Sequence, residues 1–289
     1  MPTSTPPARR PITGEERRRF AEQGWLMLPR AVPAPLLRRL LRAVDRVYAE
    51  EALAGRVRRD RSLHLLGFLP RHPAFLELLD LPTTFRYAWG LLGWNLHVHH
   101  CHLDVNPPVT DPGAPVWAWH QDGGRQNLEL ETSPRPMLSV KLAYLLTDLS
   151  ETGRGNTRII PGSHRRDTLA RPRPELGHEE PQGAIQVTGR AGDAFVFDRR
   201  LWHSRSVNTS GITRKLLFLT YTYRWVRPRD DMEIDRDTDL WRRLTPVRRQ
   251  LLGDGPDAMS HWGLGTDAVP LREELRRKGL LDPTVPQLR

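Results

Sequence analysis

Cysteine is almost absent from this chain of 289 residues, and Cys101 is its only example. A single cysteine excludes an intrachain disulfide and fits a reducing compartment, so we expect a cytoplasmic protein. Long apolar runs are also missing, since none approaches the roughly 20 residues that a membrane-spanning helix needs. The first residues, MPTSTPPARRPITGEE, include basic side chains but no apolar segment of the kind that secretory signals contain. We therefore expect neither a membrane partner nor secretion.

Lysine is scarce too, although the chain is strongly basic. The net charge is +10, yet the lysines are only Lys141, Lys215 and Lys278, and every other cation is an arginine. Such a charge raises the hypothesis of a nucleic-acid-binding protein. The arginines, however, are spread along the whole chain, with no basic stripe interleaved with aromatic residues and no nucleic-acid motif. The sequence therefore favours a solvated cationic surface, which would attract an anionic small molecule, over a nucleic-acid partner.

The middle of the chain shows no linker, and the whole chain shows no internal repeat, so we expect one domain over 13–289. A short leader, 1–12, is expected to be disordered. Within the domain, 13–93 carries helical patterns and 94–226 carries strand patterns. The tail, 227–289, contains short helical pieces that we expect to pack on the core. Helices first and many strands afterwards predict a mainly β fold with flanking helices, in the form of a sandwich or barrel.

The helical part carries recognisable start and stop signals. Thr13 is expected to cap the first helix, and Glu16 stands at the capping-box position. A longer helix is predicted over 33–54, where apolar residues recur at helical spacing. The segment 72–93 also reads as helical, with a break near Pro82.

The first strand-like run is unusually rich in histidine. On a regular strand, alternate side chains face opposite sides. One set then contains Asn95, His97, His99 and Cys101, and the other contains Leu96, Val98, His100, His102 and Asp104. A second metal site is one possible use of these histidines, but residues two apart on one strand do not complete a tetrahedron without a further ligand.

Two histidines and one aspartate form the most informative pattern of the chain. His120 and Asp122 lie two apart in WHQDGG, so on an extended strand both side chains point the same way. His203, in RLWHSRS, must then arrive from another strand. Two imidazoles and one carboxylate can hold one face of a metal and leave the other open, which is the facial triad of non-heme Fe(II) oxygenases. Taken alone, the three residues could instead be two core histidines and a turn cap.

Several longer segments carry a family resemblance. They are FAEQGWLMLPRAV, WHQDGG, LAYLLTDLSETGRGNTRIIPGSHR, GRAGDAFVFDRRLWHSRSVNTS and Arg214, in this order between Phe20 and Trp225. The chain resembles the phytanoyl-CoA dioxygenase family of Fe(II)/2-oxoglutarate oxygenases, which includes ectoine hydroxylase. The resemblance implies a double-stranded β-helix core, the jelly-roll or cupin-like fold. It also implies Fe(II) held by the triad, with 2-oxoglutarate at two of the open metal sites and O2 at the third.

Arg214 follows His203 by eleven residues, at the end of a β-like run. In the family this position holds the distal carboxylate of 2-oxoglutarate. A guanidinium suits the task because its planar fork pairs bidentately with a carboxylate. The alternative is one surface arginine among many.

Three further residues are candidates for contact with 2-oxoglutarate. His100 and Asp104 stand where ectoine hydroxylase uses a Gln and an Asn, and many relatives carry Lys at the position of Asn106. Asp104 would repel a carboxylate unless a cation such as Lys141 neutralised it. Lys141 lies in the apolar run LSVKLAYLL, where a lysine needs a partner or a wet cavity. It could face 2-oxoglutarate or an acidic substrate group, or snorkel outward from the sheet.

Arg205 departs from the family pattern, because relatives usually have a small Ser two residues after the distal histidine. Two residues along a strand is the same face, so Arg205 is expected to point toward the metal cavity, where it would bind a carboxylate or phosphate of the substrate. The alternative is that the strand ends at Ser204 and Arg205 turns to solvent.

The sequence therefore predicts an Fe(II)/2-oxoglutarate-dependent oxygenase acting on a C–H bond of a small, possibly anionic molecule, with a role in specialised metabolism. Halogenation is disfavoured, because halogenases of this fold replace the carboxylate ligand by Gly or Ala, whereas Asp122 is present. The rival readings are a catalytically inactive metal-binding sensor of the same fold and a basic nucleic-acid-binding protein. The substrate and the oligomeric state are not readable from the sequence.

Overall fold

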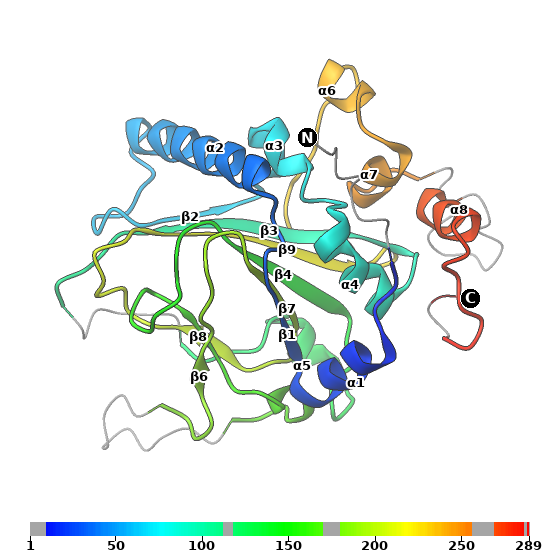
Figure 1. The fold of residues 1–289 in the computed structure, drawn as a ribbon, viewed down its shortest axis with the longest axis horizontal. Helices are drawn as coiled ribbons and strands as arrows, with labels where there is room; N and C mark the ends of the chain where they lie inside the picture. Colours follow the sequence, from blue (N-terminus) through cyan, green and yellow to red (C-terminus); the bar gives the residue numbers. More distant parts are fainter. Residues whose placement is uncertain (1–9, 112–117, 170–179, 256–268, 286–287, 289) are drawn as a thin grey trace, which may run out of the picture.

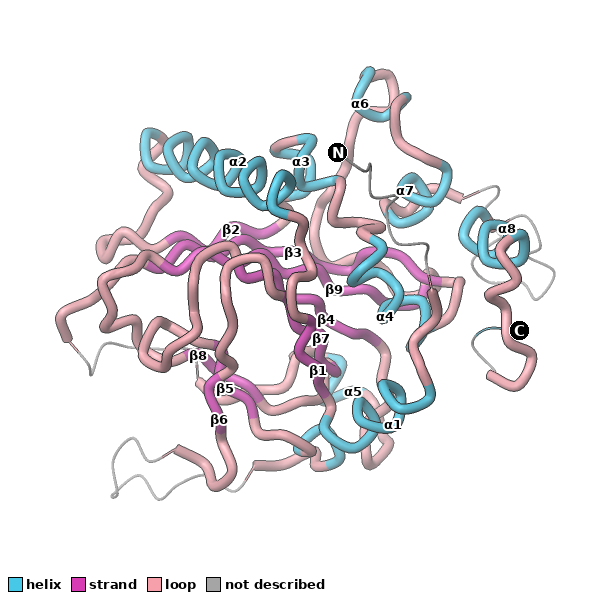
Figure 2. The backbone as a smooth tube through the Cα atoms, in the orientation of Figure 1, coloured by secondary structure: helices cyan, strands magenta, loops and turns pink. Residues whose placement is uncertain are grey.

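The computed structural model describes residues 10–111, 118–169, 180–255, 269–285 and 288 (Figures 1 and 2). The helices are α1 (Gly14–Gln23), α2 (Ala34–Leu53), α3 (Pro73–Leu76), α4 (Pro82–Leu92), α5 (Gln126–Glu129), α6 (Asp239–Arg242), α7 (Pro246–Leu251) and α8 (Pro270–Arg277), with 3-10 turns at Leu69–Arg71 and Ser163–Arg165. The strands are β1 (Trp25–Leu28), β2 (Leu63–Leu66), β3 (Leu96–Asn106), β4 (Ser139–Leu145), β5 (Thr157–Ile159), β6 (Ile185–Gln186), β7 (Ala194–Asp198), β8 (His203–Arg205) and β9 (Arg214–Tyr223). Most of the expected leader lies outside the described residues. Within them, no helix is both long and apolar enough to cross a membrane.

Two antiparallel sheets form the core. The larger has the strand order β1-β7-β4-β9-β3-β2, and the smaller has the order β6-β5-β8. An isolated bridge between His120 and His203 places His120 beside β8. The helices predicted near the start are present, and α1 begins with the expected capping box between Thr13 and Glu16. The mainly β fold with flanking helices is therefore confirmed.

The larger sheet is buried on both faces. Its outer face is covered by α2, α3 and α4 (Figure 1), and alternate residues of β4, such as Leu142 and Tyr144, belong to the core on this side. Its inner face turns toward the smaller sheet, where Ala143 and Leu145 join a second apolar cluster. Lys141 has the parity of Ala143, so its side chain enters the space between the sheets.

Strand β3 does not alternate as the sequence analysis expected. Its pairing with β9 shifts between Val98 and His100, which leaves His99 as an extra residue in a β-bulge. The extra residue reverses the face of the sheet to which each later side chain of β3 points. Val98 and Cys101 consequently share the outer core, whereas His100 faces the inner cavity. The expectation of strict alternation is wrong, because a residue pattern does not reveal where a bulge interrupts a strand.

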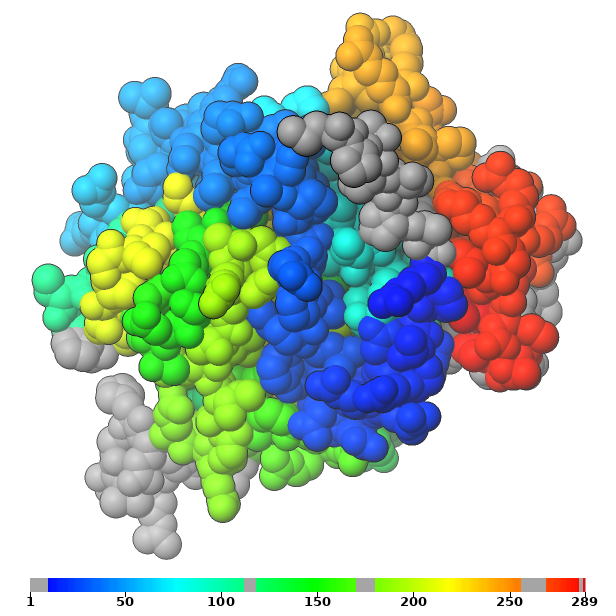
Figure 3. Space-filling view, in the orientation of Figure 1, coloured from blue at the N-terminus to red at the C-terminus, as the bar shows by residue number. Residues whose placement is uncertain are grey.

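The segment that follows β9 is held against β3 by histidines. The Nε2 atom of His97 lies 2.8 Å from the carbonyl oxygen of Val226, and Nδ1 of His99 lies 3.1 Å from that of Arg227. The backbone N–H of Arg229 in turn donates to the carbonyl of His99 at 2.7 Å. Further along, α7 packs on β3, and the tail occupies one edge of the molecule beside the N-terminal segment (orange to red, and blue, in Figure 3).

Candidate metal centre

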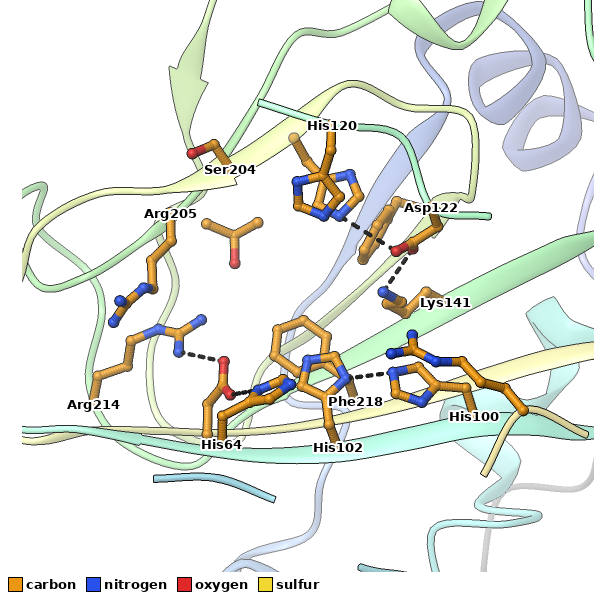
Figure 4. Close-up of a pocket in the computed structure, with 15 residues that line it drawn as sticks. His64, His100, His102, His120, Asp122, Lys141, Ser204, Arg205, Arg214 and Phe218 are labelled. Atoms are coloured by element: carbon orange, nitrogen blue, oxygen red, sulfur yellow. Dashed lines mark hydrogen bonds and ion pairs between the residues drawn. The ribbon is translucent and has the colours of Figure 1, made fainter. Parts of the chain in front are cut away.

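Backbone pairing brings two histidines face to face. The N–H of His120 donates to the carbonyl of His203 at 3.0 Å, and the N–H of His203 returns the bond at 2.9 Å. Directly opposed residues carry their side chains on the same face of the pair, and the two ring centroids are 4.2 Å apart. Asp122 is fixed nearby, because its N–H donates to the carbonyl of Arg199 at 2.8 Å. Candidate ligand atoms of His120, Asp122 and His203 all lie within 4.8 Å of one another (Figure 4).

Both imidazoles are oriented in the same way. Nδ1 of His120 lies 2.8 Å from the carbonyl oxygen of Ala118, and Nδ1 of His203 lies 2.8 Å from that of Leu201. A carbonyl only accepts, so Nδ1 carries the proton and the lone pair of each ring is on Nε2. Burial, followed by the neighbouring His120, lowers the pKa of His203 to about 3. A neutral imidazole with its Nε2 lone pair exposed is the form that a metal binds.

Asp122 completes the donor set as a carboxylate. One of its oxygens, Oδ1, lies 3.9 Å from Nε2 of His203, and the other, Oδ2, lies 2.6 Å from Nζ of Lys141. Burial alone would raise the pKa of Asp122, but Lys141, through its charge and its hydrogen bond, and the neighbouring His203 and His120 together outweigh burial and hold the pKa well below its usual range. Two neutral imidazoles and an ionised carboxylate match the requirements of Fe(II).

The three residues line one side of a cavity that holds about 650 Å³ of empty space. Figure 4 shows His120 and Asp122 at one end and Arg205 with Arg214 at the other. The sites predicted from sequence at His100, Asp104 and Lys141 line the same cavity. Other lining residues were not singled out by sequence reasoning, among them His64, Phe197, Phe218 and Arg229.

Arg214 occupies the far end of this cavity in a fully buried position, with 1% of its surface exposed. Its Nη1 donates to Oδ1 of Asn106 at 2.7 Å and to Oδ2 of Asp104 at 3.1 Å. Its Nε has no hydrogen-bond partner among the described residues. Burial, only partly offset by Asp104, lowers the pKa of Arg214 to about 10, so the guanidinium remains charged near neutral pH.

The partners of Asp104 differ from those that we expected. The cation beside it is Arg214 rather than Lys141, and Nδ1 of His64 lies 2.7 Å from its other oxygen. Lys141 is instead paired with Asp122. His64 reaches Asp104 because β2 pairs with β3 in the register that sets these two residues opposite each other. No pattern in the sequence indicates that pairing, which explains why His64 was missed.

A chain of imidazoles covers the floor of the cavity. Oδ2 of Asp230 lies 2.6 Å from Nδ1 of His100, whose Nε2 lies 2.9 Å from Nδ1 of His102. The ring of His102 stacks on Phe218 with centroids 4.3 Å apart. Both nitrogens of His100 are thus engaged within the protein, whereas Nε2 of His102 makes no hydrogen bond within the described part of the chain. A direct contact between His100 and 2-oxoglutarate stays a prediction.

The histidines of β3 do not form the second metal site considered above. His97 and His99 bind carbonyls of the tail, and His102 is grouped instead with His64 and Asp104, whose ligand-type atoms also lie within 4.8 Å of one another. Asp104 already accepts from His64 and Arg214, and the cavity beside it is rich in fixed positive charge. This group is better suited to orient a ligand than to hold a second cation.

A jelly-roll core with two histidines and a carboxylate on one side of a buried cavity defines the class of non-heme iron oxygenases. The chain belongs to the phytanoyl-CoA dioxygenase (PhyH) family, whose model matches residues 20–216. This is a family of Fe(II)/2-oxoglutarate-dependent dioxygenases, so the resemblance drawn from the motifs is confirmed.

Curated relatives with assigned names are moderately similar. "L-proline trans-4-hydroxylase" of Streptomyces griseoviridis is 28% identical over 232 residues, which cover 70% of this chain and 84% of that protein. "Ectoine dioxygenase" of Stutzerimonas stutzeri is 25% identical over 240 residues, covering 74% and 78%. "Dioxygenase af480" of Aspergillus fumigatus is 29% identical over 198 residues, but the match spans only 59% of its length.

Solved structures confirm the fold. HygX from Streptomyces hygroscopicus, with nickel and 2-oxoglutarate bound, has a TM-score of 0.62 at 17% identity and covers 81% of this chain and 94% of its own. EctD from S. alaskensis, in its apoform, has a TM-score of 0.61 at 21% identity, covering 82% and 84%. At these identities the likeness establishes the double-stranded β-helix and not the substrate.

Proposed function

We propose that this protein is an Fe(II)/2-oxoglutarate-dependent oxygenase that oxidises a C–H bond of a small molecule. The observation that carries the proposal is the shape of one cavity. The Nε2 lone pairs of His120 and His203 and the carboxylate of Asp122 lie at one end, and the buried guanidinium of Arg214 lies at the other. A dicarboxylate with a keto group at one end matches both ends at once.

Different residues would bind the metal, fix the tautomer of its imidazole ligands and orient its carboxylate ligand. His120, Asp122 and His203 would hold Fe(II), which supplies oxidation of a C–H bond by O2 with 2-oxoglutarate as the electron donor. The carbonyls of Ala118 and Leu201 keep both imidazoles in the required tautomer. Lys141 holds one oxygen of Asp122, which leaves Oδ1 directed toward His203 and the metal position. Ligand orientation of this kind strengthens and rigidifies a metal site.

Arg214 would bind the distal carboxylate of 2-oxoglutarate. Arg205 lines the same end of the cavity, and its buried Nε has no hydrogen-bond partner among the described residues. The substrate carboxylate or phosphate predicted from sequence remains one proposal for its ligand. Its place beside Arg214 favours the distal carboxylate of 2-oxoglutarate as the first anion that it meets. Asp104 then offsets the additional positive charge of a second guanidinium.

The names of the relatives indicate a broad class of substrate and no single compound. Two carry names that refer to small, charged ring compounds, L-proline and ectoine. We propose a small-molecule substrate here as well, in specialised-metabolite biosynthesis and in the cytoplasm. The reaction class remains oxidation at carbon, and hydroxylation, desaturation, epoxidation and rearrangement all start from the same site.

The wild-type protein, purified metal-free and reloaded with Fe(II), is expected to convert 2-oxoglutarate to succinate in the presence of O2. Turnover uncoupled from substrate oxidation would make the product measurable before the primary substrate is known. Succinate quantified with and without Fe(II) provides the measurement. A protein that binds Fe(II) and 2-oxoglutarate but forms no succinate, even with a broad panel of amino acids and cyclic acids, would support the sensor alternative.

Arg205→Ser is expected to weaken 2-oxoglutarate binding about tenfold while leaving the metal bound, because it removes one of two guanidiniums from the distal end. One charged hydrogen bond of this kind is worth roughly 1.5–3 kcal/mol. The KM for 2-oxoglutarate and the metal content are the measurements. An unchanged KM for 2-oxoglutarate together with a raised KM for the primary substrate would return Arg205 to the substrate, as the sequence first suggested.

A further inference from the structure

A second hollow adjoins the metal cavity on its Asp122 side. It contains about 880 Å³ of empty space, and it shares His100, Asp122, Lys141 and Arg229 with the first cavity. These shared residues mark the place where the two hollows meet. Arg205 and Arg214 line the first cavity only, at the end away from Asp122 and Lys141 (Figure 4). A ligand in the second hollow can therefore approach the metal position while 2-oxoglutarate fills the first.

The wall of the second hollow contains a buried guanidinium without an acidic partner. Arg199 is 1% exposed, and its Nη1 donates to the carbonyl of Asp122 at 3.1 Å and to Oε1 of Gln126 at 3.2 Å. Its Nε makes a long contact of 3.4 Å with the carbonyl of Pro136. Its Nη2 is buried and has no hydrogen-bond partner within the described part of the chain. Both oxygens of the adjacent carboxylate, Asp198, are bonded to Arg200, so Asp198 acts on Arg199 through its charge alone and accepts no hydrogen bond from it.

The other charges around the hollow do not provide this partner either. Among the described residues, its remaining cations are Arg125, Lys141 and Arg229, and its one lining acid is Asp122, which is paired with Lys141. Arg125 forms an exposed pair with Glu129. A buried guanidinium without a hydrogen-bonded acidic partner is costly, so a cationic hollow of this composition is suited to an anionic ligand.

The local backbone is built to admit the Arg199 side chain. Gly123, directly after Asp122, has φ +113°, and a Cβ at this position would lie 2.0 Å from Nη1 of Arg199. This backbone conformation favours glycine, and the missing side chain leaves room for the guanidinium of Arg199. The carbonyl of Arg199 also accepts the N–H of Asp122. An anion bound at Nη2 would thus contact a residue, Arg199, whose backbone is hydrogen-bonded to that of Asp122, the proposed metal ligand.

We propose that the second hollow is the primary-substrate site, and that Arg199, assisted by Arg229 at the junction, binds a carboxylate or phosphate of that substrate. The proposal rests on the function proposed above and specifies its substrate class. Arg229 suits the second role because its side chain is 55% exposed, so it can reach an incoming ligand without being buried itself. The anion would anchor the substrate beside Asp122 and present a neighbouring carbon to the metal position.

The test uses full-length protein loaded anaerobically with Fe(II) and 2-oxoglutarate, so that the distal end of the first cavity is already filled. Propionate and methyl phosphate are the probes, and isothermal titration calorimetry measures their binding. Saturable binding of at least one probe is expected for the wild type. Arg199→Gln and Arg229→Gln should each weaken that binding tenfold or more. Arg199→Lys should restore part of it, because the charge returns without the planar fork.

Arg165→Gln is the matched control, since Arg165 is exposed and, within the described part of the chain, its side chain donates only to the carbonyl of Ala21. It should bind the probes as the wild type does. Arg229→Gln keeps the test decisive if Arg199→Gln does not fold. Binding that is equally strong in both variants and the wild type would overturn the proposal, and so would the absence of saturable binding of either probe to the wild type.

The visible charge-transfer absorbance of 2-oxoglutarate chelated to Fe(II) tests the proposed function separately from the proposed substrate site. It should form in the wild type and in both variants, and it should persist when a probe is added. Its absence from the wild type would contradict the proposed function. If the absorbance forms but Arg199→Gln and Arg229→Gln bind the probes as tightly as the wild type does, only the proposed substrate site is contradicted.

Discussion

His203→Ala is expected to reduce Fe(II)-dependent succinate formation below detection and to abolish stoichiometric metal binding. His203 supplies one of three ligand atoms, and its Nδ1 bond to Leu201 directs Nε2 toward the other two. With a single imidazole and a single carboxylate remaining, the site loses the three-point grip that holds Fe(II) on one face. Metal content after desalting and succinate formation under saturating 2-oxoglutarate are the two measurements.

His72→Ala is a suitable control, because His72 caps α3 far from the cavity and offers the same loss of an imidazole. It should retain the metal and the activity. Full activity in His203→Ala would contradict the proposed triad. So would a crystal structure in which the metal is held by His97, His99 or His102 instead.

Arg214→Leu is expected to raise the KM for 2-oxoglutarate by at least about 30-fold, since loss of one partner of a buried charged hydrogen bond costs roughly 2–5 kcal/mol. The substitution also leaves Asp104 without its guanidinium, so that a buried carboxylate then faces the incoming one. Initial rates of succinate formation over a range of 2-oxoglutarate concentrations provide the measurement.

Arg214→Lys separates charge from geometry in the same assay. It should recover part of the affinity, because the charge is kept while the bidentate fork is lost. Metal content should be normal in both variants, since Arg214 contacts neither His120 nor Asp122. Unchanged 2-oxoglutarate kinetics in Arg214→Leu would show that another cation binds the distal carboxylate.

The sequence predicts the parts of the site that depend on short spacing. His120 and Asp122 lie two residues apart, and His203 belongs to a motif with a fixed distance to Arg214, so the triad and Arg214 follow from local pattern and family resemblance. The flanking helices follow from caps and periodicity. These features need no knowledge of how distant strands align.

The parts that could not be predicted depend on register and on contacts distant in sequence. The bulge at His99 changes which residues of β3 face inward, and one inserted residue leaves no signature in composition. His64 meets Asp104 only through the pairing of β2 with β3. Arg199 looks like one arginine in an Arg-rich chain until the fold shows that it is buried without an acidic partner.

The histidine contacts between β3 and the tail also suggest how this scaffold could be diversified. The match to the family ends at residue 216, whereas Arg229 and Asp230 lie beyond it, joined to the barrel through His99 and His100. The barrel thus carries the metal site, whereas the segment after β9 contributes Arg229 to the lining of both hollows. Residues 226–234 of this chain could be replaced by the corresponding segment of a relative, with the β3 histidines that hold the segment retained. Such an exchange offers a way to change substrate preference without altering the metal site.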